Sequence, residues 1–293
     1  MRKLQAWRLA ARPATLPASV GPVATGWGAA IGDDEFRALP ALAALLGALL
    51  LQVGANFAND LFDFRRGADT RERLGPPRAA QLGLLSEREL VGGMAVAFGA
   101  AFLVGLYLVY EGGWPIVAIG LGGILAAVTY TGGPWPYGYR ALGDLFVFLF
   151  FGPAAVVGTY WVQAREAPPL IWWVSLPVGA LVTAILVVNN LRDRETDRTA
   201  GKVTLAVVLG DRGTRAWYTV LVLGAYGVLL AVWGLRLAGP EVFVPLLAAP
   251  VFVRPLLAVW SGAEGRALNP VLRDTARGAG VFGLLFGIGL ALG

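Results

Sequence analysis

The 293-residue sequence contains no cysteine and no histidine. Their absence excludes disulfide scaffolds, thiolate nucleophiles, zinc sites built from cysteine and histidine, and haem held by an axial histidine. Any metal ion must therefore be a hard cation bound by oxygen ligands. Acid–base chemistry in this chain has to use aspartate, glutamate, lysine, arginine or tyrosine.

Charged residues are scarce as well: they make up 15% of the chain, against roughly 25% in a typical soluble domain. Hydrophobic residues account for 57% of the sequence, and its 40 glycines suit close packing of helices in a membrane. A chain with so little charge has to turn most of its surface toward lipid or toward other buried helices. The composition thus predicts an all-α polytopic membrane protein.

Nine apolar segments are each close to the roughly 20 residues that cross a bilayer. They are long and continuous and lack the alternation of strands, so we expect transmembrane helices in a single domain, 1–293. The predicted spans cover residues 14–32, 40–62, 91–110, 114–131, 142–162, 170–190, 216–235, 242–260 and 274–292. Basic residues precede the first span as in a signal peptide, but the later loops follow the charge rule only if this span is retained.

Lysine and arginine are distributed unevenly between the two sets of loops. Only Arg37, Arg165 and Arg236 lie on one side, which leaves 21 of the 24 basic residues on the side of the N-terminus. An excess of basic residues marks the cytoplasmic side, so we expect a cytoplasmic N-terminus and an external C-terminus. This topology accounts for the net charge of +5 without a nucleic-acid partner.

Two clusters of asparagine and aspartate end the second and sixth predicted spans. The first reads NFANDLFDFRRGAD and the second NNLRDRETDRTAGK. At 100° per residue, Asn56, Asp60 and Asp63 form one narrow helical stripe, and the polar residues of the second cluster fall within about 60° of one another. Because both clusters lie on the predicted cytoplasmic side, we expect them to be two halves of one site.

Oxygen ligands from two helices favour Mg²⁺, which binds through a few carboxylates and the phosphates of a substrate. Carboxylates at a helix C-terminus oppose the helix dipole, so helix stability does not explain them. Solvated helix ends are the alternative for either cluster alone, but the matching pair favours a metal–phosphate site. The predicted metal ligands are Asn56, Asp60, Asp63, Asp69, Asn190, Asp193 and Asp197, of which Asp60, Asp63, Asp193 and Asp197 are the predicted catalytic residues.

Basic residues that can neutralise a phosphate follow both clusters. Arg78 in RLGPPR and Lys202 in TAGK lie on loops shaped by proline and glycine, beside the carboxylates. With Arg73, they are the predicted diphosphate-binding residues. A further segment, 130–153, reads YTGGPWPYGYRALGDLFVFLFFGP, and its aromatic side chains suit a pocket for a flat ring or a carbocation. An aromatic belt at the membrane interface is the alternative there.

These segments, together with ARPATLP near residue 11, resemble the UbiA superfamily of intramembrane aromatic prenyltransferases. The resemblance covers about the first 210 residues and implies nine transmembrane helices around a central cavity. The first cluster matches one family motif at Asn56, Asp60 and Asp63, with Asp69 displaced from the usual position. The second matches the other motif at Asp193 and Asp197, and asparagine stands at 190, where many members carry aspartate.

The resemblance implies Mg²⁺-assisted loss of diphosphate from an allylic polyprenyl diphosphate and attack of an electron-rich ring on the allyl cation. Within the superfamily, the segments most resemble members that prenylate 1,4-dihydroxy-2-naphthoate, with decarboxylation, in menaquinone synthesis. The resemblance further implies that Arg140, Tyr130 and Tyr139 bind the aromatic acceptor. Arg140 would contact the acceptor carboxylate or the diphosphate. The lipid bilayer would hold the prenyl tail.

Three other functions are weighed against this one. Another acceptor, such as hydroxybenzoate, homogentisate or a porphyrin, fits the same motifs. A secondary transporter is disfavoured because transporter sites lie near the bilayer midplane, whereas both clusters end a span. A CDP-alcohol phosphotransferase needs closely spaced aspartates in one helical motif, which this sequence lacks.

Overall fold

The computed structural model describes residues 3–68 and 74–293, and most of these residues are helical. The α-helices are α1 (Lys3–Ala11), α2 (Pro17–Gly32), α3 (Ala38–Arg65), α4 (Glu87–Gly112), α5 (Trp114–Thr129), α6 (Gly143–Leu149), α7 (Ala155–Ala164), α8 (Pro169–Thr199), α9 (Leu205–Gly234), α10 (Ala249–Trp260) and α11 (Leu268–Leu292). Shorter 3-10 or π segments are η1 (Pro13–Thr15), η2 (Tyr137–Tyr139), η3 (Phe150–Ala154), η4 (Pro240–Ala248) and η5 (Gly265–Ala267). Within the two described ranges no strand forms, which confirms the all-helical prediction.

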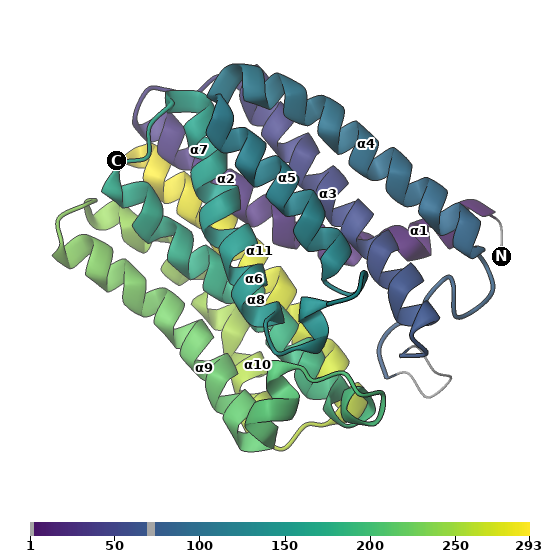
Figure 1. The fold of residues 1–293 in the computed structure, drawn as a ribbon. Coiled ribbons are helices and arrows are strands. Elements are labelled where there is room, and N and C mark those ends of the chain that lie inside the picture. The colour runs from purple at the N-terminus through teal and green to yellow at the C-terminus, as the bar shows by residue number, and fades with distance from the viewer. Residues whose placement is uncertain (1–2, 69–73) are drawn as a thin grey trace.

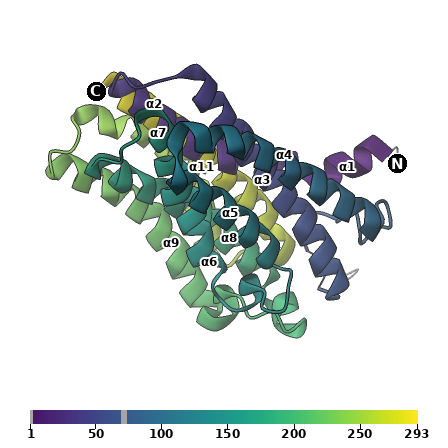
Figure 2. The same ribbon diagram turned by 45° about the horizontal axis from the view of Figure 1, so that its top comes forward.

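The helices form one bundle in which α4 and α9 lie at opposite edges (Figures 1 and 2). A large core packs α2 and α7 to α11 together, and a smaller one joins α1, α3, α4 and the segment 79–85. The C-terminal ends of α3 and α8 lie at the same end of the bundle (Figure 1). The two predicted acidic clusters are therefore carried to one end of the molecule.

Each predicted span coincides with one helix or with two or three helical segments in succession. Seven helical stretches of the described chain are long and apolar enough to cross a membrane. The other two, α2 and α5, have 16 residues each, so the count of nine crossings stays a prediction. The fifth predicted span contains a π segment at Pro153 and the eighth begins with a 3-10 segment, because proline removes a backbone donor and perturbs the regular helix.

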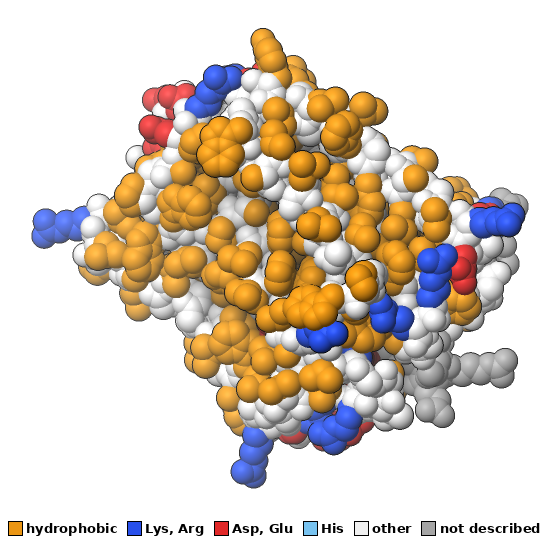
Figure 3. Space-filling view, in the orientation of Figure 1, with side chains coloured by type: hydrophobic (Ala, Val, Ile, Leu, Met, Phe, Trp, Pro, Cys, Tyr) orange, Lys and Arg blue, Asp and Glu red, His pale blue; other side chains and the backbone are white. Residues whose placement is uncertain are grey.

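The outside of the bundle is apolar. Hydrophobic side chains cover most of the face in Figure 3, and basic and acidic ones lie mainly toward its edges. Leu103, Leu125 and Leu257 each expose about two thirds of their surface. Such a surface requires lipid around it, because patches of this extent are not left in water by a soluble monomer. The protein is thus a multi-pass membrane protein.

Helices α2 and α11 pack with their backbones in close contact, since a Cβ atom added at Gly28 would collide with the backbone of Gly287. We expect Gly28→Leu to force these helices apart, at a cost of about 1–3 kcal/mol in the free energy of unfolding. The midpoint of thermal unfolding in detergent measures this loss. Gly92→Leu is the control, because a Cβ at Gly92 on α4 meets nothing within 4 Å. Equal losses in both variants would contradict the close packing.

Candidate active site

A cavity of about 570 Å³ lies inside the bundle, and both acidic clusters contribute to its wall. Asp63 from α3 and Asp193 and Asp197 from α8 line this cavity although 130 residues separate them in the sequence. Arg78 and Lys202 line it as well, so cations and carboxylates share one end. Most of the remaining wall is apolar. The structure therefore brings the two predicted halves together.

Asp63 is held by two donors at the end of α3. The Tyr139 hydroxyl donates to its Oδ1 and Nη2 of Arg78 donates to its Oδ2, each at 2.8 Å. Both partners of the Asp63–Arg78 ion pair are buried. A buried carboxylate paired in this way is fixed in orientation, and removal of either partner would leave an uncompensated charge.

Asp60 lies in a different environment from the one expected. Its two oxygens accept hydrogen bonds from the backbone N–H groups of Ala79 and Ala80, at 3.1 and 3.2 Å. Asp60 is almost completely buried and is not part of the cavity wall. Asp60, predicted as a metal ligand, thus does not line the cavity, because the segment after Pro77 folds against α3 and its backbone N–H groups bind the Asp60 carboxylate. Asp60 fixes the backbone next to Arg78.

The predicted asparagine ligands also differ from the asparagines that reach the cavity. Asn56 donates to the carbonyl oxygen of Ala11 and to Thr15, and Asn190 contacts a small void beside Asp144; neither lines the main cavity. Asn59 and Asn189 line it instead. A helical wheel did not separate these alternatives, since Asn56 and Asn59 lie only about 60° apart. The contacts of Asn56 with Ala11 and Thr15, at the end of α1 and just after it, hold its amide outside the cavity wall.

The α8 cluster contains an unsatisfied acceptor. Asp193 receives two hydrogen bonds from Arg192, at 2.8 and 2.6 Å. Asp197 has the Lys202 ammonium 3.5 Å from its Oδ1, while its buried Oδ2 has no hydrogen-bond partner within the part of the chain that the structure describes. A buried carboxylate oxygen without a donor is costly unless a cation or another ligand group approaches it. Asp197 is therefore the clearest candidate ligand in this cluster.

The aromatic segment joins the two clusters rather than standing apart from them. Tyr139 binds Asp63 through its hydroxyl, its carbonyl oxygen accepts from the backbone N–H of Val203 at 3.2 Å, and Lys202 Nζ lies 5.5 Å from its ring centroid. Tyr139 is not part of the cavity wall, so its expected contact with an acceptor is not met. Tyr130 does line the cavity. Its phenolic hydroxyl is able to donate a hydrogen bond to a ligand in the cavity.

Arg140 lies outside the cavity. Its side chain is exposed and its guanidinium stacks 4.8 Å from the ring centroid of Trp135. Arg140, predicted to bind the acceptor carboxylate or the diphosphate, does not line the cavity. The left-handed residue Ala141 and the bridge from Arg140 to Val203 fix the backbone here. Asp69 and Arg73, predicted as a metal ligand and a diphosphate ligand, lie outside the described residues.

Several polar residues of the cavity were missed in the sequence. They are Arg12, Thr15, Ser19, Gln52, Asn59, Asn189 and Thr196. Gln52 and Asn59 carried a signal, because they follow the same helical stripe as Asp63 inside an apolar span. Arg12 and Thr15 belong to the ARPATLP segment, but nothing in it indicated that they line a cavity, since the left-handed turn at Arg12 has no glycine to mark it.

Residues 19–270 match the family model described as the UbiA prenyltransferase family. The 1,4-dihydroxy-2-naphthoate octaprenyltransferase of Mycobacterium tuberculosis is 42% identical to this chain, over 100% of this chain and 99% of that protein. The protein of the same name from Escherichia coli is 37% identical, over 99% of this chain and 96% of its own length.

A solved structure of similar fold is that of a UbiA homolog from Archaeoglobus fulgidus bound to GPP and Mg²⁺. It superimposes with a TM-score of 0.72 over 98% of this chain and 100% of that chain, at 17% identity. An identity this low supports the fold alone, whereas the family match and the two curated relatives cover nearly the whole sequence. The chain belongs to the UbiA prenyltransferase family.

Proposed function

We propose that this protein transfers a polyprenyl group from an allylic polyprenyl diphosphate to 1,4-dihydroxy-2-naphthoate, with loss of the acceptor carboxylate, in menaquinone synthesis. One observation carries the proposal: carboxylates and cations from α3 and α8 face one end of a cavity whose remaining wall is apolar and aromatic. The charged end suits a diphosphate and the rest suits an isoprenoid and a flat ring. Near full-length relatives that bear the corresponding name support the same acceptor.

Mg²⁺ fits the donor set of this site. Asp63, Asp193 and Asp197 offer hard oxygen ligands, and Oδ2 of Asp197, which has no hydrogen-bond partner among residues 3–68 and 74–293, can bind a cation. Residues 3–68 and 74–293 hold no group of three acidic side chains close enough to bind a metal by themselves. This suits Mg²⁺, which is usually bound through one or two carboxylates and the phosphates of the substrate. When bound, Mg²⁺ neutralises charge on the departing diphosphate.

The side chains of the protein supply the rest of the chemistry. Arg78 and Lys202 lie beside the carboxylates and are placed to donate to the diphosphate oxygens as negative charge grows there. The ring of Tyr130 faces the cavity and stabilises positive charge on the allylic carbon. The apolar wall keeps water away from that carbon until the acceptor ring attacks it.

The acceptor is tested with purified protein, Mg²⁺, a radiolabelled polyprenyl diphosphate and a panel of aromatic acids. We expect labelled product with 1,4-dihydroxy-2-naphthoate, together with release of its carboxyl group as CO₂. Product formed instead with hydroxybenzoate or homogentisate would contradict the proposed acceptor while it kept the prenyl transfer. Absence of product with every acceptor would contradict prenyl transfer itself.

Arg140→Ala should change the Michaelis constants of both substrates by less than about twofold, because Arg140 is exposed and stacks on Trp135. Arg78→Ala should raise the Michaelis constant of the prenyl diphosphate about 10- to 100-fold, the range for loss of a charge-assisted hydrogen bond. Steady-state kinetics of the two variants make the comparison. A selective loss of acceptor affinity in Arg140→Ala would restore the role that the sequence suggested for this arginine.

The site is proposed to face the cytoplasm, because the basic loops lie at the end of the bundle that carries it. The chain has no cysteine, so single cysteines can be introduced without background. Glu166→Cys, between α7 and α8, should react with a membrane-impermeant maleimide in intact cells, whereas Thr199→Cys, at the end of α8, should react only after permeabilisation. Both positions are exposed. The reverse pattern would overturn the orientation.

A further inference from the structure

A polar stripe runs along α3 from the carboxylates into the apolar part of the cavity. At 100° per residue, Gln52, Asn59 and Asp63 lie within about 40° of one another, and all three line the cavity. Eleven residues separate Gln52 from Asp63, which corresponds to about 16 Å along the helix axis. An amide this far inside a membrane helix is unfavourable unless it serves a partner or a ligand.

Gln52 has capacity for a ligand. The Ser19 hydroxyl of α2 donates to its Oε1 and its Nε2 donates to the Thr15 hydroxyl, both at 3.4 Å, beyond the usual range for such bonds. A primary amide can donate two hydrogen bonds and accept two. Two long contacts therefore leave the Gln52 amide able to bind an oxygen that enters the cavity.

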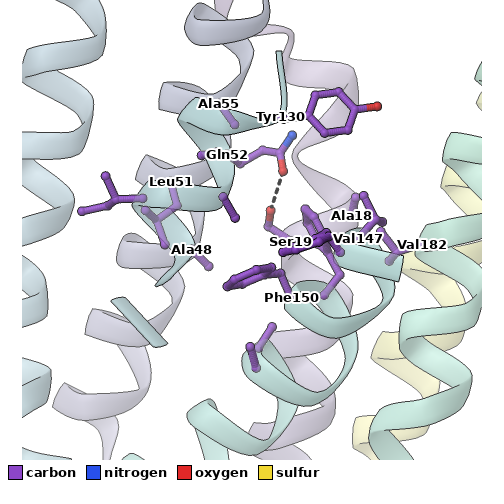
Figure 4. Close-up of a pocket in the computed structure, with 18 of the residues that line it drawn as sticks. Ala18, Ser19, Ala48, Leu51, Gln52, Ala55, Tyr130, Val147, Phe150 and Val182 are labelled. Atoms are coloured by element: carbon purple, nitrogen blue, oxygen red, sulfur yellow. Dashed lines mark hydrogen bonds between the residues drawn. The ribbon is translucent and has the colours of Figure 1, made fainter. Parts of the chain in front are cut away.

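Aromatic and small side chains line the part of the cavity around Gln52, which is here called the slot. Tyr130, Tyr137, Phe146 and Phe150 follow one another with ring centroids 5.4, 4.3 and 6.4 Å apart, and all four line the cavity. The small side chains Ala18, Ala48 and Ala55 also line it, from α2 and α3. Figure 4 shows the Gln52 amide and the Ser19 hydroxyl facing each other, with the rings of Tyr130 and Phe150 on either side.

We infer that Gln52, supported by Ser19, binds a ring oxygen of the aromatic acceptor and thereby selects acceptors that carry a hydroxyl group at that position. The inference rests on the proposed function. Aromatic side chains together with small ones suit a flat ring, and the amide suits an oxygen at the edge of that ring. The alternative occupant, an isoprenoid tail, is a hydrocarbon. It would leave the Gln52 and Ser19 polar groups buried against it without a new partner, which is unfavourable.

The test compares two acceptors, 1,4-dihydroxy-2-naphthoate and 1-hydroxy-2-naphthoate, which differ by one ring hydroxyl. In the wild-type protein we expect a preference for the dihydroxy compound, measured both as the ratio of kcat/KM values and as the ratio of equilibrium dissociation constants without prenyl donor. Gln52→Leu should reduce that ratio about 3- to 10-fold, the range for one neutral hydrogen bond. Ser19→Ala should reduce it less, and the Michaelis constant of the donor should change little in either variant.

Gln163→Leu is the matched control, because Gln163 is a buried glutamine on α7 that accepts a hydrogen bond from the Arg37 backbone and does not line the cavity. It should leave the ratio unchanged. An unchanged ratio in Gln52→Leu would mean that Gln52 only makes a structural contact with α2. A higher Michaelis constant for the prenyl donor, with no change in the ratio, would mean that the isoprenoid occupies the slot. Both results overturn the inference. If the wild-type protein makes no product, the proposed function fails, and the dissociation constants still decide the role of Gln52.

Discussion

Replacing Asp197 by asparagine is expected to lower the rate of prenyl transfer at least ~10²-fold. The change keeps the size of the side chain and removes the negative charge from Oδ2, which is buried without a donor from the described part of the chain. Loss of one strong electrostatic stabiliser of a transition state typically costs about 10²- to 10³-fold in rate. The change also weakens the buried ion pair between Asp197 and Lys202, so thermal unfolding has to be measured beside the rate. Single-turnover kinetics with pre-bound substrates measure the chemical step.

Asp63→Asn should give a loss of similar size because it also removes a carboxylate charge from the site, and it breaks the buried ion pair with Arg78. Its thermal unfolding has to be measured alongside its rate, since an unpaired buried arginine is destabilising. Glu166→Gln is the control for removal of a carboxylate, because Glu166 is exposed and does not line the cavity. If Glu166→Gln and Asp197→Asn lose activity equally, the site has been assigned to the wrong part of the molecule.

Removal of divalent cations should abolish prenyl transfer altogether. Asp63, Asp193 and Asp197 would otherwise repel the diphosphate that has to bind beside them, and Arg78 and Lys202 are already paired with two of these carboxylates. We expect no product in the presence of EDTA and full recovery when Mg²⁺ is added in excess. The concentration of Mg²⁺ that gives half-maximal rate should rise in Asp197→Asn.

Ca²⁺ added in place of Mg²⁺ is a useful comparison, because Ca²⁺ is larger and takes more ligands at longer distances.

The proposal requires that removing the metal lowers the chemical rate and not only the stability of the protein. The midpoint of thermal unfolding with and without EDTA therefore serves as the control. A full rate in metal-free buffer would exclude the metal–diphosphate site.

The helical architecture and the pairing of the two clusters were predictable from the sequence because both follow from local patterns. Long apolar runs indicate membrane helices, and all described spans coincide with helical segments. The aspartates that end α3 and α8 are rare charges in an apolar chain, so Asp63, Asp193 and Asp197 were found at once. They line one cavity because α3 and α8 end at the same end of the bundle.

The immediate neighbours of these residues were not predictable, because they depend on how loops fold over the helix ends. Asp60 and Asp63 lie on the same helical stripe, so the sequence predicts both equally as metal ligands. Only the turn at Ala79 and Ala80, which binds the Asp60 carboxylate, separates their roles. Likewise, Arg140 is the one cation of its aromatic segment in the sequence, but the outward turn beside Ala141 removes it from the cavity.

The position of Gln52 could have been predicted from helical periodicity. It lies on the same face of α3 as Asp63, three helical turns earlier, in a segment that was treated as plain apolar membrane helix. Its partner Ser19 is on α2, and no feature of the sequence near Ser19 indicates the pairing. Helical periodicity in the sequence can show that a polar residue lies on the same helix face as a charged cluster. The contact between Gln52 and Ser19 on two different helices is seen only in the structure.

The central claim is that carboxylates of α3 and α8 bind one diphosphate together through a metal ion. Equilibrium binding of an unreactive prenyl thiodiphosphate, measured with and without Mg²⁺, tests it most directly because no chemical step intervenes. The wild-type protein should bind this compound only with Mg²⁺, and Asp63→Asn and Asp197→Asn should each lose the metal-dependent part of the affinity. Metal-dependent binding at wild-type affinity in either variant would contradict a site shared by the two helices.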